Sequence, residues 1–102
     1  VYGATGGVGH IGVQLAKWAG ATVYALVSSD EKGAIARKLG ADFTINYRQQ
    51  PVEEFVAEHT DGQGFDVVFD TVGNDNLQQA FKAAKLNGTV ISTVSLSQQD
   101  LT

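Results

Sequence analysis

Apolar residues along the chain follow two spacings that alternate. Short apolar runs, typical of strands covered on both faces, are separated by segments in which apolar residues recur every three or four positions, as in helices packed on one side. We therefore expect strands at 1–2, 22–27, 42–47, 66–70 and 89–94. Helices are expected at 9–19, 28–40, 51–60 and 75–85.

Each expected helix has an apolar stripe that would pack on the sheet. The inward residues should be Ile11, Leu15 and Trp18, then Ile35, Ala36 and Leu39, then Val52, Phe55 and Val56, and finally Leu77, Phe81 and Ala84. Ser28 and Glu31 have the spacing of a capping box, Gly40 should end the second helix, and Asn87-Gly88 should form a turn. Alternating strands and helices predict an α/β fold in three layers, with a parallel sheet and right-handed crossovers.

Composition narrows the class of protein. The 102 residues correspond to one domain, with 43% hydrophobic and 18% charged residues as in an ordinary globular domain. A net charge of -4 argues against a nucleic-acid partner, and no apolar run is long enough to cross a membrane. Zero Cys excludes disulfides and thiolate zinc sites in this segment, and we expect a cytoplasmic location.

The first strand is unusually short. Two residues precede the first glycine, whereas a central strand normally has about 5–6 residues. Met is also absent from the chain. We interpret the sequence as a piece of a longer protein, in which upstream residues complete this strand.

Glycines fall at positions 3, 6, 9 and 12, between this strand and the first helix. Glycine allows a tight turn and has no Cβ to hold a phosphate away, and the helix start offers free N–H groups and a positive dipole end. We expect the Gly6, Gly7, Val8 and Gly9 backbone to meet a pyrophosphate. The Thr5 hydroxyl either binds a phosphate oxygen or caps the turn. A doubly wound sheet in the order 3-2-1-4-5 would place this ligand at its switch point.

The end of the second strand bears on the choice of dinucleotide. NAD-binding domains usually carry an acid there for the ribose, whereas this chain has Ser28 with Lys32 one helical turn later. Both side chains suit a 2′-phosphate and favour NADP(H). Asp30 and Glu31 are the counter-evidence, since either would reach the ribose of NAD(H).

Several stretches together carry a family resemblance. The chain resembles the medium-chain dehydrogenase/reductase superfamily, above all its quinone oxidoreductase and zinc-type alcohol dehydrogenase-like branch. The resemblance runs in order through residues 6–17, 38–42, 45–48, 64–73 and 88–90. It implies that residues 1–102 form the Rossmann-type cofactor domain of a two-domain NAD(P)H-dependent oxidoreductase whose separate domain holds the substrate and any zinc.

The resemblance also implies further site residues. Tyr47 would contact the adenosine phosphate, with the adjacent Arg48 adding charge, and Val72 and Gly73 would lie near the nicotinamide. Hydride would pass between the nicotinamide and a quinone, enone, or alcohol/aldehyde. We expect a homodimer, no catalytic or metal-binding residue in this segment, and no turnover by the segment alone.

Three other classes stay open. A short-chain or NmrA-like protein would use a similar glycine spacing, in some cases only as a redox sensor. A methyltransferase would bind S-adenosylmethionine in the same cradle, but would prefer an acid after the second strand. A purely structural or interaction module is the third.

Overall fold

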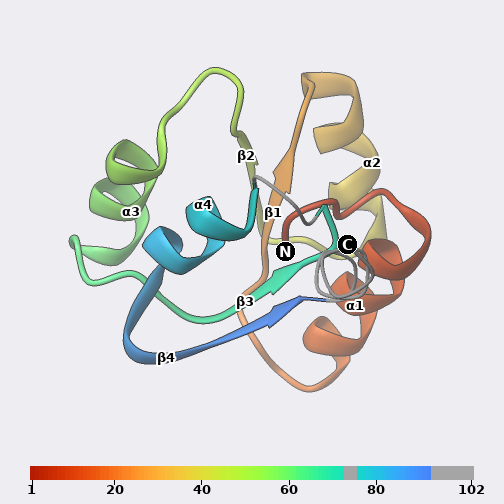
Figure 1. The fold of residues 1–102 in the computed structure, drawn as a ribbon. Helices are drawn as coiled ribbons and strands as arrows, with labels where there is room; N and C mark the ends of the chain where they lie inside the picture. The colour runs from red at the N-terminus through yellow and green to blue at the C-terminus, as the bar shows by residue number, and fades with distance from the viewer. Residues whose placement is uncertain (73–75, 93–102) are drawn as a thin grey trace, which may run out of the picture.

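The computed structural model describes residues 1–72 and 76–92, apart from the side chain of Leu77. Helices α3 and α4 lie on one side of the strands and α1 and α2 on the other (Figure 1). The elements in chain order are α1 (Gly7–Trp18), β1 (Tyr24–Val27), α2 (Asp30–Leu39), β2 (Phe43–Asn46), α3 (Val52–Thr60), β3 (Phe65–Asp70), α4 (Asn76–Ala83) and β4 (Ala84–Ser92). None of the helices in this described part is long and apolar enough to cross a membrane.

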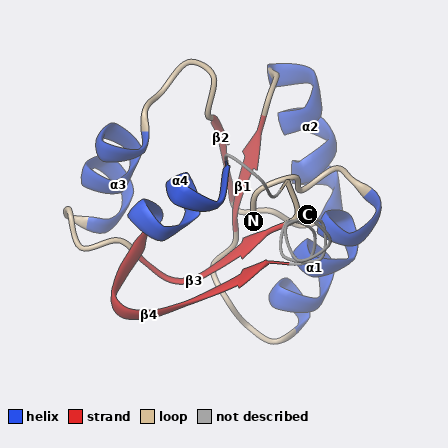
Figure 2. Cartoon of the chain, viewed as in Figure 1, coloured by secondary structure: helices blue, strands red, loops and turns tan. Residues whose placement is uncertain are grey.

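The strand order is the predicted one. β1 pairs in parallel with β2, and β3 pairs in parallel with β4. Tyr2 joins the two pairs, because it forms parallel bridges to Leu26 of β1 and Asp70 of β3. The order β2-β1-Tyr2-β3-β4 is therefore 3-2-1-4-5 when the strands are numbered from the one containing Tyr2. The α/β fold in three layers is confirmed (Figure 2).

The sheet has a buried core on each face. Tyr2, Leu26 and Val68 pack with Phe55 of α3 on one face, and Ala80 and Ala83 of α4 complete this cluster. On the other face, Ala4, Val13, Val23, Ala25, Val27 and Ala36 form a second cluster with α1 and α2. Because both faces are covered, the dense apolar runs of the strands are explained.

The predicted inward stripe of α1 is wrong. Ile11, Leu15 and Trp18 are 51%, 60% and 88% exposed, while Gly9 and Val13 are buried. The reason is the close approach of this helix to the strands. A Cβ on Gly12 would come within 2.6 Å of the Phe69 ring. Small residues must therefore face the sheet, and the large ones turn away from it.

The same correction applies in part to α2 and α4. Ala36 is buried and Leu39 half-buried as predicted, but Ile35 is 49% exposed. In α4, Phe81 is 60% exposed, whereas Ala80 and Ala83 are buried. Ala84 is half-buried as the first residue of β4, and the side chain of Leu77 lies outside the described part. The prediction for α3 is confirmed, since its three expected apolar residues are buried.

The predicted N-cap of α2 and the predicted turn at Asn87-Gly88 are each wrong by a few residues. Ser29, not Ser28, caps α2, since its hydroxyl oxygen accepts a hydrogen bond from the Lys32 N–H at 3.3 Å. Asn87-Gly88 does not separate α4 from the last strand, because β4 already begins at Ala84. Asn87 has φ 66°, and the pairing with β3 shifts register at this place. The predicted stop at Gly40 is confirmed, with φ 118°.

Candidate functional site

The glycine turn after Tyr2 is held between two strands. Gly3 adopts φ 73°, a conformation that suits glycine, and its carbonyl accepts the Gly6 N–H at 3.0 Å. Helix α1 then starts at Gly7, directly at the carboxyl edge of the sheet. A Cβ on Gly9 would overlap the carbonyl oxygen of Gly3, so this position must be glycine for the helix to follow the turn so closely.

The start of α1 is open to an anion. Its N-cap residue, Gly6, provides no side-chain hydrogen bond, and no acid lies in the first turn. Gly6, Gly7 and Val8 are exposed. The first N–H groups of a helix have no partner within the helix, and together with the dipole they attract negative charge. This geometry fits the phosphates of a dinucleotide, and the half-buried Thr5 lies in the turn itself.

A second polar group forms where β1 ends. The Lys32 ammonium donates to the Ser28 hydroxyl at 3.2 Å, so the two predicted side chains lie together. Lys32 is exposed, and its backbone N–H is already occupied by the Ser29 cap. A hydroxyl and a cation at the start of α2 form an arrangement that can take up a phosphate monoester.

The turn that follows β2 brings two more predicted residues, Tyr47 and Arg48, to this edge. The Tyr47 N–H donates to the Val27 carbonyl at 3.1 Å, which places Tyr47 beside the last residue of β1. The Tyr47 ring is half-buried, with its centroid 5.8 Å from that of Tyr2. Arg48 is exposed, and its N–H donates to the Asn46 side chain at 3.0 Å.

Asp30, the main counter-evidence for NADP(H), has a partner in the structure. The Asn46 amide donates to the Asp30 carboxylate at 3.4 Å, across the gap between β2 and α2. Asp30 and Glu31 also lie in the first turn of α2, where acids stabilise the helix dipole. Both acids therefore have a structural explanation that does not involve a ribose.

The end of β3 lies against the glycine turn. The Thr71 hydroxyl donates to the Tyr2 carbonyl at 2.9 Å, and a Cβ on Gly3 would come within 3.4 Å of Val72. Asp70 is fully buried, and its carboxylate accepts the Val72 N–H at 2.9 Å, so it caps this turn. Gly73, predicted near the nicotinamide, lies outside the described residues, as do positions 93–95 at the end of the last predicted strand.

Tyr2 lies beneath the carboxyl edge as a buried phenol. Burial raises its pKa well above the usual range, and the nearby Asp70 and Tyr47 raise it further. Its hydroxyl finds no hydrogen-bond partner within the described part of the chain. Tyr2 therefore stays neutral at physiological pH and belongs to the packing of the central strand.

Two residues that were not among the predicted site residues also shape the site. Thr71 fixes the glycine turn, and Asn46 binds both Asp30 and the Arg48 backbone. Their positions in the sequence could have identified both residues. Each lies at or just after the end of a strand, and the ends of parallel strands gather at one edge of the sheet. Among the described residues, no three His, Asp or Glu side chains gather where they could hold a metal ion.

Comparisons with known proteins agree with this geometry. A family model described as zinc-binding dehydrogenase matches residues 7–101. A 2-haloacrylate reductase from a Burkholderia species is 47% identical over 88 residues, which are 86% of this chain and 26% of that protein.

Two solved structures show the same arrangement. An alcohol dehydrogenase superfamily protein from Novosphingobium aromaticivorans has a TM-score of 0.85 and 40% identity, over 93% of this chain and 28% of that one. Quinone oxidoreductase from Escherichia coli, crystallised with NADPH, has a TM-score of 0.78 and 31% identity, over 98% of this chain and 33% of that one. The chain thus spans between 26% and 33% of the length of these three relatives.

Proposed function

The chain belongs to the zinc-binding dehydrogenase family of the medium-chain dehydrogenase/reductase superfamily, and on this premise we propose that it is the NADP(H)-binding domain of an oxidoreductase. The observation that carries the proposal is the uncapped start of α1 behind the Gly3 turn, at the carboxyl end of the central strand. The relatives include reductases and a quinone oxidoreductase whose structure contains NADPH.

The residues at this edge have separate roles in the proposal. The backbone of Gly6, Gly7, Val8 and Gly9 binds the pyrophosphate, with Thr5 beside it. At the other end, a 2′-phosphate meets Ser28 and Lys32, which already lie 3.2 Å apart. Tyr47 and Arg48 complete this end from the turn after β2, and Val72 and Gly73 approach the nicotinamide. NADP(H) is preferred because no carboxylate occupies the end of β1 and Asp30 is bound by Asn46.

The chemistry divides between the cofactor and the protein. When bound, the nicotinamide supplies or accepts the hydride. The residues of this chain bind and orient the dinucleotide, and Asp70 and Thr71 keep the glycine turn in place. The acceptor, a quinone, enone, or alcohol/aldehyde, is held by a second domain that also carries any zinc ligands. NAD(H) would bind more weakly in the same groove.

Partners follow from this role. The domain works with the catalytic domain of its parent protein and with a second copy as a homodimer, in the cytoplasm. It has no nucleic-acid or membrane partner. Residues 1–102 are the dinucleotide-binding unit, and on their own they bind cofactor without reducing substrate.

Calorimetric titration with NADPH, NADH and S-adenosylmethionine tests the proposal. We expect saturable binding of NADPH, weaker binding of NADH and none of S-adenosylmethionine. Binding of S-adenosylmethionine alone would assign the cradle to a methyltransferase-like domain. NADPH oxidation is then assayed with quinones and enones. Turnover near that of an intact reductase would contradict the assignment of catalysis to a second domain.

A further inference from the structure

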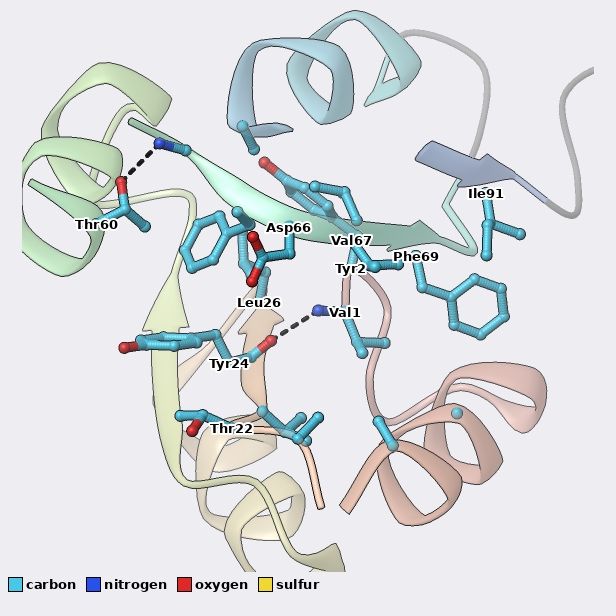
Figure 3. A pocket seen from close by; sticks show the side chains of 18 residues that line it. Val1, Tyr2, Thr22, Tyr24, Leu26, Thr60, Asp66, Val67, Phe69 and Ile91 are labelled. Atoms are coloured by element: carbon cyan, nitrogen blue, oxygen red, sulfur yellow. Dashed lines mark hydrogen bonds between the residues drawn. The ribbon is translucent and has the colours of Figure 1, made fainter. Parts of the chain in front are cut away.

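Two cavities away from the glycine turn differ in chemistry. One, of about 890 Å³, lies between β1 and β3, and its lining includes the apolar side chains of Leu26, Val67 and Phe69 (Figure 3). The other, of about 240 Å³, lies between α2 and β2. Its lining includes four polar residues, which are Asp30, Arg37, Thr44 and Asn46. The polar cavity adjoins the cofactor edge, because it reaches the first residue of α2 and the last residue of β2.

Helix α2 lies close to β2 at Gly33. A Cβ on Gly33 would come within 3.4 Å of the Thr44 hydroxyl oxygen. Asp30 is three residues before Gly33 and therefore lies on the same face of the helix, nearer its start. Asn46 is two residues after Thr44 and therefore lies on the same face of the strand, nearer its end. The packing of this helix on this strand thus brings the Asp30 carboxylate to the Asn46 side chain.

The Asn46 side chain uses both ends of its amide. Its Oδ1 accepts the Arg48 N–H at 3.0 Å, and its Nδ2 donates to the Asp30 carboxylate at 3.4 Å. The reverse orientation would set the NH₂ group against the Arg48 N–H and the oxygen against the carboxylate, so these neighbours fix the orientation. The main-chain carbonyl of Asn46 also accepts the Gln49 and Gln50 N–H groups, at 3.1 and 3.2 Å. Asn46 therefore holds the turn after β2 and the acid of α2 at the same time.

The bond to Asn46 keeps the Asp30 carboxylate on the β2 side of α2. Lys32, two residues later, donates instead to the Ser28 hydroxyl at 3.2 Å. Residues two apart on a helix do not face each other, so the acid and the cation diverge from the start of α2. Asp30 is exposed, and its position therefore depends on this hydrogen bond rather than on burial.

An Asp30 carboxylate released from Asn46 would act in opposite directions on the two dinucleotides. The 2′-phosphate of NADP(H) carries roughly two negative charges at neutral pH, and a free carboxylate at the start of the same helix repels it. The 2′-hydroxyl of NAD(H) is a donor that a free carboxylate accepts. Release of Asp30 would thus weaken the binding of NADPH and strengthen that of NADH.

We propose that Asn46 is a positioning residue that sets the preference for NADP(H), because it binds the Asp30 carboxylate and holds it away from the adenosine ribose. Asn46 itself contacts neither the ribose nor its phosphate, and it acts through Asp30. The inference rests on the proposed function, since it requires a dinucleotide at the carboxyl edge of the sheet.

A double-mutant cycle tests the proposal. Asn46→Ala removes the amide, Asp30→Asn removes the charge at nearly constant size, and a third protein carries both changes. Calorimetric titration gives the dissociation constants of NADPH and NADH for each protein and for the wild type. Gln49→Ala is the matched control, because it removes an exposed amide side chain from the same turn.

Asn46→Ala should lower the ratio of NADPH to NADH affinity by about tenfold, whereas the same change in the Asp30→Asn protein should lower it by less than about threefold. Gln49→Ala should leave the ratio unchanged. An unchanged ratio in Asn46→Ala would overturn this inference alone, and so would equal falls in both backgrounds. A wild-type chain that binds NADH as tightly as NADPH would overturn the cofactor assignment and this inference with it.

A second measurement needs neither a cofactor nor a folded Asn46 variant. In NMR spectra of the free chain, Asp30→Asn should shift the side-chain amide signals of Asn46, because the bonded carboxylate is lost. Glu31→Gln removes the neighbouring charge and should leave these signals in place. Signals that respond to neither change, or equally to both, would show that Asn46 does not bind Asp30 and would overturn the proposal.

Discussion

The two ends of the parallel sheet differ in which backbone groups they leave without partners. At the carboxyl end, the sheet carries the uncapped start of α1 and the hydrogen-bonded pair Ser28 and Lys32. The first N–H groups of such a helix are suited to an anion. At the amino end, β1 and β3 face each other across an apolar cavity, whose lining includes Tyr24, Leu26 and Phe69. Free helix N–H groups on a polar rim suit an anion, whereas an apolar cavity does not. The carboxyl end of the sheet is therefore the end suited to a phosphate-bearing cofactor.

The largest expected effect is a pH dependence of the free energy of unfolding, caused by the buried amine of Val1. Above about pH 5 the folded chain holds a neutral Val1 amine, whereas the unfolded chain stays protonated up to about pH 8. Protons therefore favour unfolding in this window, and stability should rise with pH between these values by up to about 4 kcal/mol. Urea unfolding of a chain that begins at Val1 measures it. Acetylation of the Val1 amine removes the titrating group and should abolish the rise. A rise that persists in the acetylated chain would contradict its assignment to Val1.

The next effect concerns the carboxyl end. Gly9→Ala places a methyl group against the Gly3 carbonyl and should lower the free energy of unfolding by about 3 kcal/mol. Gly7→Ala is the matched control, because nothing lies within 4 Å of its Cβ position. It should change stability by less than about 1 kcal/mol. Thermal unfolding of the two variants gives the answer, and equal losses would mean that the turn is not closely packed.

A smaller effect tests cofactor choice. Lys32→Ala removes the cation beside Ser28 and should weaken NADPH binding roughly ten- to a hundred-fold, as expected for a charge-assisted contact of about 1.5–3 kcal/mol. NADH binding should hardly change, and added salt should shrink the difference. Lys38→Ala, at the exposed end of the same helix, is the control. Equal weakening of both cofactors by Lys32→Ala would show a structural role instead.

The smallest effect concerns the outer edge of the sheet. β4 pairs only with β3 in the described part of the sheet, and we expect weak self-association through its free edge. Ile91, 46% exposed on this strand, is the residue to change. Ile91→Lys should shift a monomer–dimer equilibrium toward monomer in sedimentation experiments, whereas Ile35→Lys on α2 should not. A strict monomer at high micromolar concentration would refute the prediction.

The sequence predicted the fold well because strand order follows from alternation and from the position of the glycine turn. The prediction failed for α1, where contacts with the sheet decide which of two helix faces is buried. The spacing of Ile11, Leu15 and Trp18 is as helical as that of Gly9 and Val13, but only the smaller residues fit against Phe69 and the Gly3 turn. The buried face of α1 was therefore assigned wrongly, because the prediction placed the largest apolar residues toward the sheet.

In the candidate site, too, the sequence predicted contacts within one element but not contacts between separate elements. Ser28 and Lys32 were identified as neighbours from helical spacing, and they are hydrogen-bonded. The choice between Ser28 and Ser29 as the cap depends on the backbone conformation at the end of β1, which two adjacent serines do not reveal. The bond between Asn46 and Asp30 joins β2 to α2, and local spacing does not predict contacts between separate elements.

Backbone amide shifts on addition of NADPH test the central claim most directly, because they report both ends of the sheet in one titration. The account predicts large shifts for Gly7, Val8 and Gly9 and for Ser28 and Lys32, with Tyr24, Val67 and Phe69 unchanged. Shifts confined to Tyr24, Val67 and Phe69 would place the ligand in the amino-end cavity and contradict the assignment of the carboxyl edge as the NADP(H) site.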